Sequence, residues 1–172
     1  MAAVGWLRRI LGATSADEMN GISLAAPVWV LSGVKANASQ FLRALPSLVP
    51  GDAFLFLEGH AYSEQVRSYL ESEQVEVSPR PALGTVWPRL SYFSIPATPQ
   101  VLERLAVIAE GLSPTEICTH LHVFRRDAVL LSGYDAFTSE FWLSAELVED
   151  KVRAFSEAVG GTYKRDETAH AG

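Results

Sequence analysis

The sequence predicts a single α/β domain built on a mixed β-sheet. Two apolar runs, residues 24–32 and 53–57, flank a segment with helical periodicity, which is typical of parallel strands buried on both faces. Further along, residues 117–143 indicate one long strand, a tight turn at Arg126 and Asp127, a second strand and a third, short strand. We therefore expect a βαβ-type N-terminal half with parallel strands, then an antiparallel three-stranded meander and a C-terminal helix.

The length and composition suit one folded domain. The chain has 172 residues, 48% of them hydrophobic, and a single cysteine, Cys118. No internal disulfide is possible, which favours a reducing compartment. We divide the chain into a short N-terminal helix and linker (residues 1–23), one α/β domain (residues 24–161) and a polar C-terminal tail (residues 162–172).

Charge and hydropathy exclude several classes of function. A net charge of −6 disfavours nucleic-acid binding, because neutralising phosphates requires a basic face. No apolar run approaches the roughly 20 residues of a membrane-spanning helix, and Arg8 and Arg9 interrupt the first apolar residues, so we expect neither a span nor a signal peptide. We expect a cytoplasmic protein. The predominance of arginine over lysine points to a GC-rich bacterial source.

The first half contains two predicted helices between its strands. Asn37 or Ser39 caps the first helix, and Pro46 ends it. The second runs over residues 63–71. Their predicted inward side chains are Phe41, Leu42 and Leu45 in the first helix and Val66, Tyr69 and Leu70 in the second.

The second half has clearer boundaries. A weak strand at residues 75–77 and another at residues 90–95 precede a helix that Thr98 caps, with Pro99 at its first position and Gly111 past its end. Residues 113–116 match a capping box. A last helix is predicted over residues 144–159, with an inward face of Val148, Val152, Phe155 and Val159.

The first strand of the meander carries residues capable of chemistry. A two-residue turn at Arg126 and Asp127 would place Cys118, His120, His122 and Asp135 on one sheet face. This set suggests a metal site or a Cys–His–Asp nucleophile arrangement. In the alternative, the histidines are half-buried under a helix and hydrogen-bonded to the backbone or to Tyr134. The prediction depends on register, because a shift of one residue moves Asp135 to the other face.

Two further candidates lie in loops. Glu58 and His60 follow a predicted parallel strand, where ligands bind in α/β sheets, and form a candidate acid/base pair. The loop at residues 78–89 contains three prolines with Arg80, Trp87 and Arg89, residue types that are enriched at binding hot spots. We predict that this loop binds a partner protein. In the alternative, Trp87 fills the edge of the core.

We interpret the chain as a non-enzymatic interaction domain, an accessory or inhibitor-like protein without a cofactor. The sequence contains no HExxH, CxxC, GxSxG or Walker motif. The alternative is a metal-assisted hydrolase that uses the face of His120, His122 and Asp135. The sequence does not identify the partner or the oligomeric state.

Overall fold

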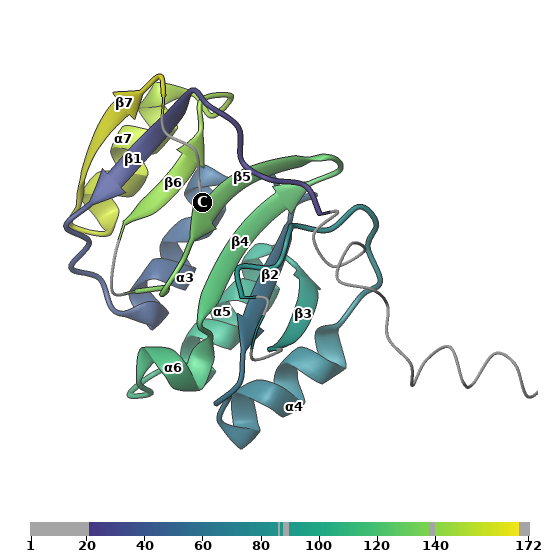
Figure 1. Cartoon of the computed structure of the whole chain (residues 1–172). Helices are drawn as coiled ribbons and strands as arrows, with labels where there is room; N and C mark the ends of the chain where they lie inside the picture. Colours follow the sequence, from purple (N-terminus) through teal and green to yellow (C-terminus); the bar gives the residue numbers. More distant parts are fainter. Residues whose placement is uncertain (1–20, 86, 88–89, 138–139, 169–172) are drawn as a thin grey trace, which may run out of the picture.

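The chain folds around a seven-stranded antiparallel sheet with its helices packed on one face (Figure 1). The computed structural model describes residues 21–85, 87, 90–137 and 140–168. The strands are β1 (Val28–Ser32), β2 (Phe54–Gly59), β3 (Ser91–Pro96), β4 (His120–Arg125), β5 (Ala128–Gly133), β6 (Phe141–Ser144) and β7 (Thr162–Asp166). The helices of this part are α3 (Ala38–Leu48), α4 (Glu64–Glu73), α5 (Pro99–Ile108), α6 (Pro114–Ile117) and α7 (Glu149–Ala158).

The prediction of a single α/β domain is confirmed, but the prediction of parallel strands is wrong. The strand order is β3-β2-β4-β5-β6-β1-β7, and every neighbouring pair is antiparallel. Strands β1 and β2, which the apolar runs suggested as parallel neighbours, are separated by β4, β5 and β6. The predicted N-terminal helix at residues 1–13 lies outside the described residues.

Local capping signals account for the helix starts. The Asn37 side chain accepts the Gln40 N–H at 2.9 Å, and the Gln40 side chain accepts the Asn37 N–H at 3.1 Å, so the two residues form a capping box. Thr98 caps α5 as predicted, accepting the Val101 N–H with its side chain, and Ser63 caps α4 by accepting the Val66 N–H. Pro46 lies inside α3 rather than at its end. It removes one N–H donor, and the helix still closes with a bond from Val49 N–H to the Leu45 carbonyl.

The main core lies between the sheet and the helices. Its centre is Phe41 of α3, which stacks on Phe141 at 4.5 Å between ring centroids and meets Phe155 edge-on at 5.3 Å. The inward residues predicted for α3 and α4 are all buried. Val148 is different: it is 61% exposed and precedes α7, so its predicted inward position is wrong.

In the described part of the chain, the opposite face of the sheet is covered by irregular segments rather than by helices. A smaller apolar cluster lies there, in which Ile22, Leu24, Val77 and Leu83 cover side chains of the strands. The strand residues are Val28, Val30, Phe54, Phe56, Tyr92, Phe124, Val129 and Trp142. These contacts explain why β1 and β2 are apolar on both faces although none of the described helices covers the second face. We call this surface the helix-free face.

Two predicted elements differ in the structure. Residues 75–77 form no strand, although the Val75 N–H donates to the Ser94 carbonyl at 2.9 Å. The stretch from Thr162, for which the sequence suggests a polar tail, contains β7, and this strand pairs with β1 along its whole length. Tyr163 packs edge-on against Trp29 at 5.7 Å. The partner strand thus stabilises a segment whose own sequence carries little apolar signal.

Candidate functional site

A β-bulge sets which side chains meet on the helix-free face. The hairpin turn at Arg126 has the predicted length, with Arg125 opposite Ala128 and Phe124 opposite Val129. The register then shifts, so that His122 lies opposite Ser132 rather than Leu131. The extra residue is Leu130, which packs in the main core. The bulge therefore brings a serine, and not a leucine, beside His122.

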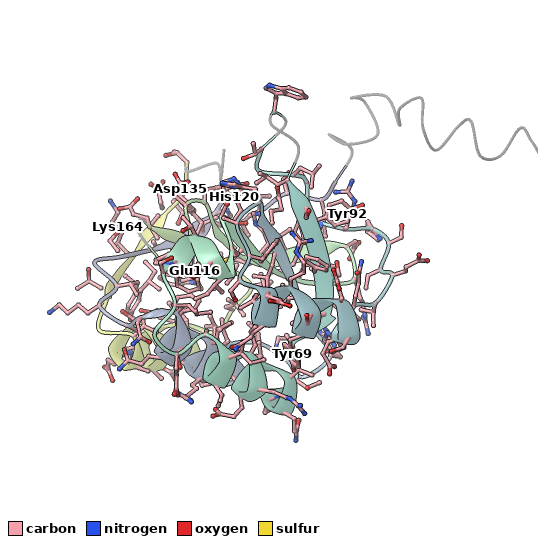
Figure 2. The ribbon with its side chains drawn as sticks, turned by 90° about the horizontal axis from the view of Figure 1, so that it is seen from below. Tyr69, Tyr92, Glu116, His120, Asp135 and Lys164 are labelled. Atoms are coloured by element: carbon pink, nitrogen blue, oxygen red, sulfur yellow. The ribbon has the colours of Figure 1, made fainter. Side chains whose placement is uncertain are left out.

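The result is a buried polar cluster on the helix-free face. Glu58 comes from β2, His120 and His122 from β4, and Ser132 from β5. Their exposed fractions are 0%, 6%, 2% and 2%. In Figure 2, His120 and Asp135 lie on the side of the sheet opposite to the helical layer, which contains Tyr69. We call Glu58, His120, His122 and Ser132 the polar cluster.

Both ring nitrogens of His120 are engaged. Nδ1 accepts the backbone N–H of Asp135 at 3.2 Å, so the proton of the neutral ring is on Nε2. Nε2 lies 2.7 Å from the Thr85 hydroxyl and donates to it in this tautomer. Burial lowers the pKa of His120, while the negative charge of Asp135 opposes the shift. His120 is therefore a neutral connector between the strand and the loop that contains Thr85.

His122 faces Glu58 without a direct hydrogen bond. Its Nδ1 lies 3.0 Å from the Ser132 hydroxyl, and its Nε2 lies 3.9 Å from Glu58 Oε1, which is beyond hydrogen-bond length. Burial, with a contribution from His120, lowers the pKa of His122 to about 3, so the pair is not an ion pair at neutral pH. Burial raises the pKa of Glu58, against the opposing effects of the Gly84 and Thr85 N–H groups and the charge of Arg80.

The other predicted site residues lie outside the polar cluster. Cys118 precedes β4, packs in the main core at 1% exposure, and has a pKa raised by burial. It therefore does not share a face with the histidines. Asp135 is exposed and contributes its backbone N–H. His60 is exposed beyond the end of β2, whereas Glu58 is buried, so these two do not form the predicted acid/base pair.

The composition of the cluster suggests hydrolysis, but its geometry does not favour it. Ser132, His122 and Glu58 are the residue types of a nucleophile, base and acid. A nucleophile must reach a substrate, and Ser132 is 2% exposed. Within the described ranges, no group of three His, Cys, Asp or Glu side chains is arranged to hold a metal ion. The cluster is better described as a network that fixes the backbone around it.

This geometry makes a prediction about metal content. Because His120 uses both nitrogens and His122 uses one, metal binding would have to break existing hydrogen bonds. We expect elemental analysis of the purified, untagged protein to find zinc, iron and nickel well below one equivalent. A content of one equivalent that the double change His120→Ala and His122→Ala abolishes would instead support the metal-assisted hydrolase.

The polar cluster is hydrogen-bonded to Gly84 and Thr85 of the loop at residues 78–89, and we call these two residues the root of the loop. Glu58 Oε1 accepts the Gly84 N–H at 2.8 Å, and Thr85 bonds to His120. A Cβ added to Gly84 would lie 2.6 Å from His120 Cδ2 and 2.9 Å from Tyr134 Cε1, so only glycine allows this close approach. On its other side the loop pairs with Ile22, whose N–H donates to the Arg80 carbonyl at 2.9 Å.

Trp87 projects beyond this fixed root. Its exposed fraction is 86%, the largest among the large hydrophobic side chains of the described residues. The expectation that Trp87 fills the edge of the core is therefore wrong. Arg80 packs against the Tyr92 ring, with 4.8 Å between its Cζ and the ring centroid. Arg89, the third predicted contact residue, lies outside the described residues.

Sequence reasoning missed Gly84, Thr85 and Ser132. The signal for Ser132 is the run Val129–Leu130–Leu131, in which two adjacent leucines break the alternation of a strand. Gly84 and Thr85 carry no signal of their own, because their role depends on residues 26 and 35 positions away.

Comparison with known proteins does not place the chain in a family. No protein-family model, curated protein or solved structure matches it. No helix in the described part of the chain is long and apolar enough to cross a membrane.

Proposed function

We propose that the protein is a non-enzymatic interaction domain that binds a partner protein through the loop at residues 78–89. The observation that carries this proposal is the 86% exposure of Trp87 on a loop whose root is hydrogen-bonded to the sheet. Exposing an indole to water is unfavourable, and a tryptophan that no core contact requires is a typical interface anchor.

The polar cluster supports this proposal because it limits the freedom of the loop. Gly84 and Thr85 bond to Glu58 and His120, and Arg80 and Ala82 bond to Ile22. A loop that is already ordered at its root loses less conformational entropy when a partner binds. The polar cluster thus has a role that does not require access for a substrate. It orders the loop that exposes Trp87 to a partner.

The hydrolase alternative is less favoured for a geometric reason. Among the described residues, no three His, Cys, Asp or Glu side chains are arranged to hold a metal ion, and both nitrogens of His120 already make hydrogen bonds. A second reason is the 2% exposure of His122. An interaction domain requires neither an accessible base nor an open coordination site.

The test compares Trp87→Ala with a matched exposed apolar residue, Val148→Ala. We expect both variants to keep the melting temperature of the wild type, because both side chains are mostly in water. We expect Trp87→Ala alone to lose the proteins that the wild type retains from a lysate, with affinity for the purified partner reduced by roughly thirty-fold or more.

Two results would contradict the proposal. In one, Trp87→Ala lowers the melting temperature by several degrees, which would assign Trp87 a structural role. In the other, Trp87→Ala retains the same proteins with the same affinity as Val148→Ala.

A further inference from the structure

A cavity lies on the helix-free face beside the loop. It has a volume of about 520 Å³ and separates the segment at residues 74–80 from the edge strand β3. Tyr92 and Ser94 of β3 form one side, while Val75 and Val77 contribute apolar surface on the other. Arg80 completes the lining. This volume is within the range of sites that bind small molecules or inserted side chains.

Arg80 brings a positive charge to this cavity. In the described part of the chain, no carboxylate pairs with its guanidinium, and its one hydrogen bond is a long one, 3.4 Å to the Pro81 carbonyl. The guanidinium lies over the Tyr92 ring, and this cation–π contact favours its position beside the cavity. A planar guanidinium with free N–H donors is suited to a carboxylate, which it binds through two parallel hydrogen bonds.

Ser94 provides a second, independent observation. The residue is only 6% exposed, and its backbone carbonyl accepts the Val75 N–H, which fixes the opposite wall of the cavity. Its hydroxyl lines the cavity and makes no hydrogen bond to any of the described residues. This hydroxyl is therefore available to donate a hydrogen bond to a ligand oxygen placed beside it.

We propose that this cavity binds the carboxylate of an acidic side chain, presented by the partner protein that docks on the adjacent loop. Arg80 binds the carboxylate, Ser94 donates its hydroxyl to it, and an apolar neighbour of the acidic residue packs against Val75 and Val77. Glu76 also lines the cavity. Its negative charge disfavours a dianion such as phosphate more than a carboxylate. The proposal rests on the proposed function and names the chemistry of its partner.

The probe for this test is the capped peptide acetyl-Leu-Glu-Leu-amide, compared with its Glu-to-Gln counterpart and with inorganic phosphate. Binding to the full chain is followed by NMR titration of backbone amides. We expect saturable shifts at Ser94 and Val75 with the glutamate peptide, and dissociation constants roughly tenfold or more higher for the glutamine peptide and for phosphate.

Three variants separate the contacts. Arg80→Gln and Ser94→Ala should each lower the affinity for the glutamate peptide, the first by roughly tenfold or more and the second by roughly threefold or more. Arg104→Gln is the matched control, because Arg104 also lies over a tyrosine, 5.9 Å from the Tyr69 centroid on the helical layer. This control should change the affinity by less than about twofold.

The proposal fails if the glutamate and glutamine peptides bind equally, if phosphate binds more tightly than the glutamate peptide, or if Arg80→Gln and Arg104→Gln have the same effect. It also fails if no shifts at Ser94 or Val75 saturate. Testing the peptide on Trp87→Ala distinguishes this site from the proposed function. Unchanged peptide binding there supports the cavity independently of whether Trp87 anchors the partner.

Discussion

Leu105→Ala is expected to lower the free energy of unfolding by about 2–5 kcal/mol. Leu105 is fully buried on the inner side of α5, where this helix packs against α3. Truncating it removes apolar contacts and leaves a cavity that close-packed neighbours fill only in part. Urea denaturation monitored by circular dichroism measures the loss as a lower transition midpoint with an unchanged slope.

Glu103→Ala on the outer side of α5 is the control. Its side chain is 55% exposed and pairs with Arg43 of α3, which also reaches Glu110. Exposed ion pairs contribute little to stability, and Arg43 keeps its second partner. We therefore expect the free energy of unfolding to change by no more than about 0.5 kcal/mol. Equal effects of the two substitutions would mean that the buried face of α5 is assigned wrongly.

The helices could be predicted because their signals are local. Thr98, Pro99 and Gly111 mark the limits of α5, and Gly111 has a φ of +77°, which glycine adopts without strain. Such signals depend on residues within one turn of each other. The same holds for the capping box of α3. Residues that are close in sequence are therefore enough to predict the boundaries of these helices.

The direction of the strands could not be predicted in the same way. The apolar run in β1 correctly indicates burial on both faces, since Val28, Trp29, Val30 and Leu31 are all at most 7% exposed. Burial on two faces is typical of parallel sheets covered by helices. Here Leu24 and its neighbours cover the second face without forming a helix. An apolar run therefore reports burial, and it does not distinguish a covering helix from a covering loop.

For a related reason, only one part of the polar cluster could be predicted, namely that the two histidines share a face. His120 and His122 share a face because they are two residues apart in one strand. Which residues lie opposite them depends on Leu130, the bulge residue, and hence on a shift of one position in the partner strand. The predicted alternative, in which the histidines are half-buried under a helix and bonded to the backbone or to Tyr134, is correct only in part. His120 does accept a backbone N–H, that of Asp135. The described helices do not cover the histidines, and the other hydrogen bonds go to Thr85 and Ser132.

The stability of the folded protein is expected to decrease as the pH falls from about 6.5 towards 5, with His122 as a principal cause. The pKa of His122 is about 3 in the folded protein against 6.5 for an ordinary histidine. Between these values the unfolded chain binds a proton that the folded chain does not. The contribution of His122 is therefore fully present above about pH 6.5 and is lost towards pH 3. One such proton corresponds to about 1.4 kcal/mol per pH unit.

His120 acts in the same direction, because burial lowers its pKa as well. Glu58 acts in the opposite direction. Its raised pKa means that the folded chain keeps a proton that the unfolded chain has lost above about pH 4.5. The contribution of Glu58 is therefore fully present below that pH and is lost as the pH rises through the folded pKa. In the wild type, Glu58 partly cancels the slope that the two histidines produce.

Two variants separate these opposing contributions by the slope of unfolding free energy against pH between 5 and 6.5. Glu58→Gln keeps an acceptor for the Gly84 N–H but no longer titrates, so its slope should be steeper than that of the wild type. His122→Asn keeps a group able to bond to Ser132 but no longer titrates. Its slope should be shallower by about 1 kcal/mol per pH unit, because the unfolded histidine is only partly protonated in this range. The slope is measured independently of how much each substitution destabilises the protein. Parallel curves for all three proteins would show that the buried pair does not titrate differently in the folded and unfolded chains, and the assigned protonation of the polar cluster would then be wrong.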